Sequence, residues 1–450
     1  MELLWTDKCF LGVLVIAAVT ILYSLRKKHI RLAFQRIITR PLAVSAGIVL
    51  LFFLAIGVLD SIHLNSSLYQ SKNASGGQYD SILDRILAPL SSFYEKTYSA
   101  PLALNLYSVE TRLINDRAQQ VYPRLHYVKS TIKKKDKHRI IINTIYKAII
   151  VSFLLILIGW LLVVLLRWLF YRKLSVLPRK VGISALITFF VCFFIAIASY
   201  WISRDFHLLG TGKIGQDIFY YTIKSIRTGL VIGILTTLFM LPLALFFGIA
   251  AGYFGGLIDD IIQYVYTTLS SIPGVLLITA SVLSMQTYIA NHPQQFETLA
   301  KSADARLLAL CLILGVTSWT SLCRLLRAET LKLREIDYVT AARALGSSSF
   351  AIILKHLLPN VMHIVLITLV LDFSFLVLAE AVLSYVGVGV SPLTISWGNM
   401  INGARLELAR EPIVWWPMMS AFVFMFILVL ASNLFADAVR DAFDPHQATA

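Results

Sequence analysis

The 450-residue sequence has little charge and few cysteines. Charged side chains make up 14% of the chain and hydrophobic ones 58%, whereas about a quarter of a typical soluble domain is charged. This composition excludes most soluble folds and indicates a polytopic membrane protein. The four cysteines show no CxxC spacing and lie in or beside apolar runs. They therefore predict neither a disulfide framework nor a zinc site.

Motifs for catalysis are also missing. The string nearest to a nucleotide-binding P-loop is HLLGTGKIGQD (207–217), in which His207 replaces the first glycine and Ile214 replaces the magnesium-binding Ser or Thr. The nine histidines are scattered without paired ligand spacing, and no G-x-S-x-G turn occurs. We therefore predict that the chain is not an enzyme and holds no nucleotide of its own.

Acidic residues are fewer than basic ones, and the formal net charge is +15. In a soluble chain this excess would suggest a nucleic-acid partner. In a membrane protein, basic loops hold the apolar helices in register with the bilayer. We therefore predict contacts with membrane lipid and no nucleic-acid partner.

Long apolar runs dominate the sequence. A helix that crosses ~30 Å of hydrocarbon needs ~20 apolar residues. The first run could pass for a signal peptide, but no small-residue cleavage site follows it, so we expect it to be retained. The fold class is thus an all-α polytopic membrane protein. The predicted spans are 9–25, 42–59, 142–170, 181–202, 229–252, 265–286, 306–323, 361–385 and 414–435.

Basic loops predict the orientation. Residues 26–40 and 171–180 carry basic side chains and no acid, so both should face the cytoplasm. Alternation of the spans then places the N-terminus outside and the C-terminus in the cytoplasm. The basic stretch KKKDKHR (133–139) falls on the outer side, where a long loop can be translocated despite its charge.

Composition also divides the chain into four parts. Between the second and third spans lies a polar insert in which Ile82, Ile86, Leu87 and Leu90 recur at helical spacing, so we predict a mostly helical, extracytoplasmic element. The predicted parts are 1–59 with two spans, the insert 60–139, 140–180 with a third span and a basic loop, and 181–450 with six spans.

One polar stretch, DYVTAARALGSSSFAIILKHLLPN (337–360), separates two apolar runs. Its alanines predict a short helix with a smooth face that another protein can approach closely, and Gly346 should end this helix. One of the serines that follow should cap a second, amphipathic helix near the membrane surface, which Pro359 should stop. The apolar stripe of that helix is predicted at Phe350, Ile353, Leu354 and Leu357. This stretch is either a docking element or a plain interfacial loop, and its small-residue face favours docking.

The same stretch resembles the EAA motif of ABC importer permeases. It contains TAARALG and an LP pair that ends thirteen residues beyond the glycine. The Glu-Ala-Ala, Gly and Leu-Pro positions of the motif fall on Thr340, Ala341, Ala342, Gly346, Leu358 and Pro359. Thr340 stands where the family has glutamate, which removes one acidic docking contact. The resemblance implies a coupling loop over 334–360, with a docking face of Ala341, Ala342, Leu345 and Gly346.

Six further strings, in the family's order, resemble signatures of the C-type permease subunit of dipeptide/oligopeptide transporters. The first departs from the family at Gly212 and Gln216. The resemblance extends over about 181–446 and does not cover 1–180. The strings are HLLGTGKIGQD, AGYFGGLIDD (251–260), LSSIPGVLL (269–277), LAEAVLSYVGVGV (378–390), SWGNM (396–400) and VRDAFDP (439–445).

The resemblance implies a six-helix ABC importer permease core preceded by about three extra membrane helices. Such a subunit lies in the bacterial cytoplasmic (inner) membrane and forms half of a translocation path for peptides. It pairs with a B-type permease subunit. Two cytoplasmic ATPase subunits carry the ATP and magnesium, and an extracytoplasmic substrate-binding protein delivers the cargo. The chain itself would need no cofactor.

Two acids in the eighth predicted span could line the path. Asp372 lies near the centre of the span, and Glu380 lies two turns further along. Because a carboxylate in hydrocarbon is costly, Asp372 must face protein or water, be paired, or stay protonated. It either makes a buried hydrogen bond or lines the path and favours cationic cargo. An ion-coupled secondary transporter, or a scaffold or export component with the permease fold, are the alternative functions.

Overall fold

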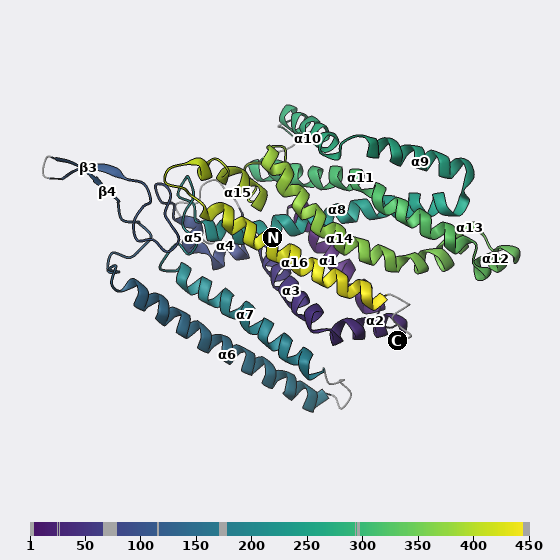
Figure 1. Cartoon of the computed structure of the whole chain (residues 1–450), viewed down its shortest axis with the longest axis horizontal. Helices are drawn as coiled ribbons and strands as arrows, with labels where there is room; N and C mark the ends of the chain where they lie inside the picture. Colours follow the sequence, from purple (N-terminus) through teal and green to yellow (C-terminus); the bar gives the residue numbers. More distant parts are fainter. Residues whose placement is uncertain are drawn as a thin grey trace. The chain divides into compact units, whose positions relative to one another are not determined.

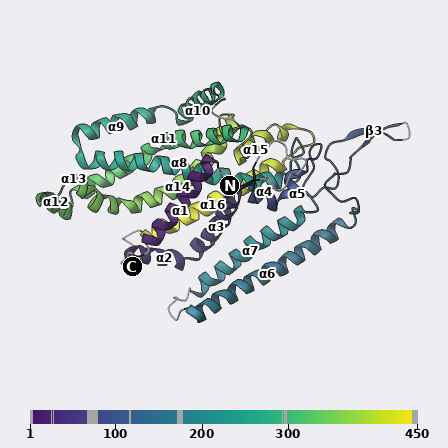
Figure 2. The same ribbon diagram turned by 180° about the vertical axis from the view of Figure 1, so that it is seen from behind.

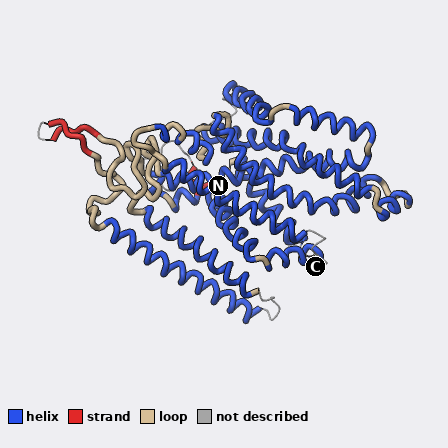
Figure 3. Tube along the Cα trace, in the orientation of Figure 1, coloured by secondary structure: helices blue, strands red, loops and turns tan. Residues whose placement is uncertain are grey.

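The computed structural model describes residues 4–24, 26, 28–65, 79–114, 117–170, 178–292, 294 and 298–443. Within these ranges the chain is mostly helical (Figures 1 and 3), and nine of its helices are long and apolar enough to cross a membrane. This confirms the all-α polytopic class. The nine are α1 (Trp5–Ser24), α3 (Pro41–Ser61), α6 (Lys137–Phe170), α7 (Arg179–Ser203), α8 (Ile218–Phe254), α10 (Gly274–Asn291), α11 (Leu299–Arg334), α14 (Leu358–Val386) and α16 (Trp416–Phe443).

The chain forms two compact units. Unit 1 contains Phe34–Thr228 and Ile395–Ala431, and unit 2 contains Leu3–Ala33, Gly229–Thr394 and Ser432–Ala450. The helix α8 contributes its first turns to unit 1 and the rest to unit 2. The described helical elements outside the insert and the coupling region also include the shorter helices α2 (Lys28–Thr39), α9 (Gly256–Ser271) and α15 (Trp397–Ala404) and the 3-10 turn η4 (Glu407–Ala409).

In unit 1, α7 packs against α6 on one side and α3 on the other (Figure 1). Small polar side chains join α3 to α7, since the Oγ atoms of Ser45 and Ser184 lie 2.8 Å apart and Thr188 Oγ1 donates to Ser45 Oγ. Such small residues let membrane helices approach closely. The helix α6 leaves most of its apolar side chains exposed, including Phe153 and Trp160, as expected of a lipid-facing helix.

The prediction that the insert 60–139 is mostly helical is wrong. Its described part is mainly loop (Figure 3), with two one-turn helices and four short strands in two antiparallel pairs. Pro89 restricts the backbone before it and has no N–H to donate, so it ends one helix and begins the next. Residues 66–78 of the insert lie outside the described residues. The elements are β1 (His63–Asn65), β2 (Tyr79–Ser81), α4 (Ile82–Ile86), α5 (Ala88–Ser92), β3 (Glu110–Ile114) and β4 (Arg117–Val121).

Buried charges and close backbone contacts hold the insert to the loop 204–217 and to the start of α8, all within unit 1. Asp84 accepts hydrogen bonds from Lys224 Nζ at 2.6 and 2.7 Å and from the Tyr220 hydroxyl at 2.6 Å. Gly215 has a φ of +77°, and a Cβ there would lie 1.7 Å from the carbonyl oxygen of Glu95. Only glycine permits both this conformation and this approach.

His207 forms a second buried charged contact with the insert. Its Nδ1 lies 2.5 Å from Asp217 Oδ2, and its Nε2 lies 3.8 Å from Glu95 Oε1. Asp217 Oδ1 also accepts the backbone N–H of Tyr220 and so caps the start of α8. Burial opposes the protonation of His207, but the two carboxylates outweigh burial and raise the pKa of the imidazole to about 9.

In unit 2, the sixth span differs from its predicted range of 265–286. Residues Gly256–Ser271 form a separate amphipathic helix, α9, and the apolar helix α10 starts only at Gly274. Ile272 is extended, as the residue before a proline prefers, so the helix cannot continue through Pro273. The prediction merged two helices because both are apolar around the break.

The helix α1 packs against α11, also in unit 2. The backbone N–H of Thr6 donates to Asp304 Oδ2 at 3.1 Å, and the Thr6 hydroxyl donates to Asp304 Oδ1. Thr6, Asp7 and Phe10 are fully buried. The first predicted span is thus a packed helix of unit 2.

Candidate functional site

The predicted coupling region lies at one end of unit 2, between α11 and α14 (Figure 2). It consists of the helix α12 (Asp337–Ala344), a turn, the one-turn helix α13 (Ser349–Ile352) and the π-helical turn η3 (Ile353–Leu357). The last of these runs directly into α14. The region is therefore a loop with two helical parts, as the sequence predicts.

Gly346 ends α12 as predicted. Its φ is +78°, and its N–H donates to the Arg343 carbonyl at 3.0 Å while the N–H of Ser347 donates to the Ala342 carbonyl at 3.1 Å. This pair of bonds is a Schellman motif, which requires a left-handed residue at the glycine position. Ser348 then caps α13, since its Oγ accepts the N–H of Ala351. The predicted hinge and serine cap are confirmed.

The second half of the region differs from the prediction. Pro359 does not stop a separate amphipathic helix, because α13, η3 and α14 form one continuous helix from Ser349 to Val386. In η3 the N–H of Leu358 donates to the carbonyl of Ile353, five residues back. This wider turn carries the helix past Pro359, which has no N–H to donate and whose ring would otherwise clash with the Lys355 carbonyl.

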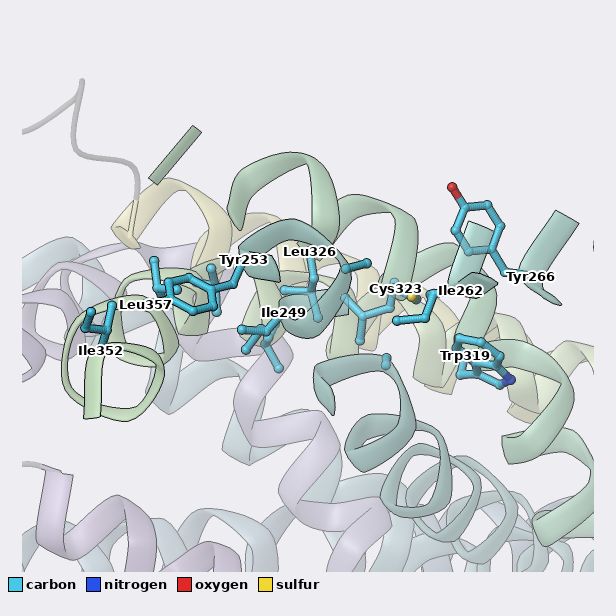
Figure 4. Close-up of a cluster of buried hydrophobic side chains, with 14 of the residues drawn as sticks. Ile249, Tyr253, Ile262, Tyr266, Trp319, Cys323, Leu326, Ile352 and Leu357 are labelled. Atoms are coloured by element: carbon cyan, nitrogen blue, oxygen red, sulfur yellow. The ribbon is translucent and has the colours of Figure 1, made fainter. Parts of the chain in front are cut away.

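An apolar cluster holds the coupling region to the ends of α8 and α11 (Figure 4). Val339 and Ala342 from α12 are buried in it, together with Ile352 and Leu357 from the second half. Phe350 and Leu354, which the sequence assigned to the buried stripe, are exposed. The π-turn contains one more residue than an α-helical turn, so the buried positions are Ile352 and Leu357, five residues apart. The predicted stripe assumed α-helical spacing of three or four residues. The α8 and α11 members of the cluster include Ile249, Tyr253 and Leu326.

Polar contacts fix the same junction. Arg334 Nη1 donates to the carbonyls of Gly252 and Tyr253, the last turn of α8, at 3.4 Å each. The guanidinium of Arg343 lies 5.5 Å from the centre of the Tyr253 ring. Arginine suits both positions, because its guanidinium can donate to the free carbonyls at a helix end, as Arg334 does, or stack on an aromatic ring, as Arg343 does. These contacts join the end of α8 to α11 through Arg334 and to α12 through Arg343.

A buried ion pair adds α9 to this junction. Arg327 Nη2 donates to Asp259 Oδ2 at 2.6 Å, and Nε donates to the other carboxylate oxygen. The hydrogen bonds from Arg327 hold the pKa of the Asp259 carboxyl below its usual value. The pair gives the start of α9 a fixed position on α11.

The outer face of α12 carries the exposed side chains. Leu345 is 86% exposed and Phe350 is 72% exposed, and Ala341 and Ala344 are also exposed. A partner that covered these two large apolar side chains would bury apolar surface, which is favourable. Thr340, at the family's glutamate position, is exposed and donates to the carbonyl of Asp337.

The exposed residues of the coupling region differ in part from the predicted docking face. Ala342 was placed on it, but Ala342 is only 9% exposed and packs inward. Leu358 is half-buried and Pro359 exposed, and both lie at the start of α14. Ala341, Leu345 and Gly346 of the predicted face are exposed, and with the exposed Ala344 and Phe350 they are here called the docking patch. The i, i+3 spacing of Ala341 and Ala344 could have identified Ala344 from the sequence.

The two acids of α14 differ in their surroundings. Glu380 is buried and accepts a hydrogen bond from Ser384 Oγ at 2.7 Å, one turn along the same helix. Asp372 is half-buried, and it makes no hydrogen bond or ion pair with any residue that the structure describes. Within the described part of the chain, a buried hydrogen bond therefore does not explain Asp372.

Comparisons with known proteins agree with this geometry. Residues 244–449 match the family described as binding-protein-dependent transport system inner membrane component. The chain is 32% identical over 239 residues to the oligopeptide transport system permease protein OppC of Mycobacterium tuberculosis, a match that covers 53% of this chain and 76% of OppC. The chain belongs to this family.

Two other members of the binding-protein-dependent permease family are similar to the chain. The glutathione transport system permease protein GsiD of Pectobacterium atrosepticum is 30% identical over 53% of this chain and 72% of its own length. The dipeptide transport system permease protein DppC of Lactococcus lactis subsp. cremoris is 29% identical over 54% of this chain, and the chain covers 64% of that protein.

The family strings build the coupling region. AGYFGGLIDD spans the end of α8 and the start of α9 and supplies Tyr253 and Asp259. The residues that match the family, 244–449, contain the end of α8 and all of α10, α11, α14 and α16, whereas α1, α3, α6 and α7 precede the match. Among the described residues no group of three or more His, Cys, Asp or Glu could hold a metal ion.

Proposed function

We propose that this permease subunit imports peptides and that its docking patch binds a cytoplasmic ATPase subunit. The observation that carries the proposal is the coupling region itself, which is packed rigidly on α8 and α11 while Leu345 and Phe350 remain exposed. A protein that covers these two side chains would remove apolar surface from water. Movement of that protein would be passed to α8 through Arg334 and Tyr253.

The proposed assembly has four kinds of partner. A B-type permease subunit completes the translocation path, and two ATPase subunits bind ATP and magnesium. An extracytoplasmic binding protein supplies cargo, and lipid surrounds the spans. The relatives named for dipeptide, oligopeptide and glutathione transport support peptide cargo.

We propose that Asp372 lines the path and recognises a cationic group. Its carboxylate lies in an apolar span, and no residue that the structure describes in this chain pairs with it. Because exposure of a charge to lipid is costly, the group that satisfies Asp372 should come from water, cargo or the partner permease. The amino group of a peptide has the required charge. Glu380, already bonded to Ser384, has a structural role in this proposal.

The proposed location is the bacterial cytoplasmic membrane, with the N-terminus and the insert outside and the C-terminus in the cytoplasm. A cysteine at the exposed Ser130 would test this orientation. In intact cells stripped of any outer barrier, it should react with a membrane-impermeant maleimide. Labelling only after lysis would reverse the proposed topology.

An uptake assay tests the function. The chain would be reconstituted with its partner subunits in vesicles, and accumulation of a labelled tripeptide would be measured with ATP and with an ionophore. The proposal predicts uptake that requires ATP and survives the ionophore. Uptake that the ionophore abolishes would indicate an ion-coupled transporter, and ATP-driven efflux of the peptide would indicate an export component.

A further inference from the structure

A dense basic segment in unit 1 is not used by the proposed import function. Residues 129–147 contain seven Lys or Arg side chains and one acid, Asp136. Lys129 pairs with Asp205 at 2.8 Å, but Lys133, Lys134 and Lys135 are exposed. This charge would be unremarkable on a free loop in water. The segment, however, leads directly into the long apolar helix α6, so its charges lie next to a predicted membrane span.

The backbone beneath these lysines is fixed. Arg124 Nη2 donates to the carbonyls of Lys129 and Ile132, at 2.7 Å each, and thereby clamps the turn. Ile132 and Val128 are buried in an apolar cluster that also contains Ile202 from the end of α7. The three lysines that follow therefore extend from a rigid platform, so a ligand that binds them need not order the chain.

The helix that follows faces lipid. Arg139, Asn143 and Lys147 recur every four residues and are all exposed, so they lie on one face of α6. Tyr146, which is 64% exposed, lies beside them, and the next exposed residues are apolar, among them Phe153. Basic residues and tyrosine followed by exposed apolar residues are typical of a helix that passes from the headgroup region into hydrocarbon.

We propose that Lys133, Lys134, Lys135, Arg139 and Lys147 form a binding site for the phosphate groups of anionic phospholipids. The side chains reach the headgroup level from two directions, from the clamped turn and along α6. Long lysine and arginine side chains suit this position, because their apolar stems can lie along the acyl region while the charge stays at the interface. The bound lipid would anchor α6, which packs mainly against α7.

Membrane lipid fits this surface better than an acidic protein does. The cations continue along α6 to Lys147, whose neighbours Ile149 and Ile150 are exposed apolar residues. A soluble protein could reach the clamped turn, but the lower part of the cluster would be covered by lipid. The proposal does not depend on which side of the membrane the turn faces.

The test measures cardiolipin binding by the full chain in detergent, with native mass spectrometry as the readout and phosphatidylcholine as the neutral lipid. Each basic residue near an anionic surface contributes about fivefold in affinity, so Lys133→Gln with Lys134→Gln and Lys135→Gln should weaken cardiolipin binding on the order of a hundredfold. Binding of phosphatidylcholine should not change. Added salt should weaken the wild-type interaction and have little further effect on the triple variant.

The matched control is a second triple variant with the same loss of charge, made at exposed basic residues of unit 1 outside the segment: Arg85→Gln, Lys96→Gln and Lys213→Gln. It should bind cardiolipin like the wild type. If the segment variant unfolds earlier than the control in phosphatidylcholine, Arg139→Gln with Lys147→Gln serves instead, with an expected loss of more than tenfold. Wild-type affinity in the segment variants would overturn the proposal, as would an equal loss in the control. Unchanged lipid binding with lost capture of the purified binding protein would assign the surface to that protein.

Discussion

The coupling region and the insert are both polar interruptions between apolar spans, yet they are held in different ways. In the coupling region, α12 and its hinge follow from a few adjacent residues, and an apolar cluster fixes their position. The insert has little regular structure and is held by partly buried charges, such as Asp84 against Lys224, which lie 140 residues apart. The first kind of segment leaves one face free for a partner. In the second kind, polar side chains of the segment bond to other residues of the same chain.

The largest effect is expected from breaking the charge that holds the insert. Lys224→Met should destabilise unit 1 by about 2–3 kcal/mol, because it leaves the half-buried Asp84 without its cation while the bond from Tyr220 remains. Unfolding of the purified chain with denaturant would measure this loss. Adding Asp84→Asn should restore part of the stability. If Lys224→Met alone matches the wild type, buried charge does not hold the insert.

A smaller effect is expected in the coupling region, where backbone conformation matters more than charge. Gly346→Val should cost roughly 1–2 kcal/mol or more, because a β-branched residue resists a positive φ. Nothing lies within 4 Å of the position where a Cβ would be, so the cost would come from conformation alone. Gly346→Asn is the control and should be nearly neutral. Equal uptake rates and melting temperatures for the valine and asparagine variants would contradict the Schellman hinge.

Titration of His207 with pH should change the stability of unit 1 by a smaller amount than the substitutions do. The pKa of His207 is about 9 in the folded chain, above its ordinary value of 6.5. Its charged contacts therefore stabilise unit 1 fully below pH 6.5, and this contribution falls as the pH rises through about 9. The melting temperature should fall by a few degrees over this range, and His207→Gln should flatten that fall. An unchanged slope in the variant would show that other groups cause it.

The smallest effect on stability is expected at Asp372, which lies in α14, outside both the coupling region and the insert. Asp372→Asn keeps the size of the side chain and removes its charge, so folding should change little. Uptake of cationic peptides should fall about tenfold, since a hydrogen bond to a charged group is worth about 1.5–3 kcal/mol. Uptake of neutral peptides is the internal control. If both fall together, or neither changes, Asp372 does not select cargo.

The same contrast explains which features the sequence predicts. Gly346 and Ser348 act on their immediate neighbours, so the hinge and the cap were predictable from residue type. The nine spans were predictable in number because an apolar run long enough to cross a membrane is a local property. Their ends were less predictable, as the break at Pro273 illustrates.

The features that sequence alone did not provide depend on distant contacts or on helix geometry. The insert carries helical spacing at Leu87 and Leu90, but Pro89 limits α4 and α5 to one turn each. The position of the insert depends on distant residues such as Phe219 and Tyr220. The burial of Ala342 and the exposure of Phe350 follow from packing on α8 and from the π-turn. Neither feature leaves a signal in the local sequence.

The most direct test of the central claim is whether the docking patch holds the ATPase. The tagged chain would be expressed with its partner subunits, and the ATPase recovered with it would be measured for the wild type, Ala341→Arg and Ala300→Arg. Ala300 is an exposed alanine of the same unit, in the first turn of α11, and serves as the matched control. The docking patch predicts that Ala341→Arg loses most of the ATPase while membrane insertion and melting temperature stay normal, and that Ala300→Arg keeps it. Full recovery of the ATPase with Ala341→Arg would contradict the assignment.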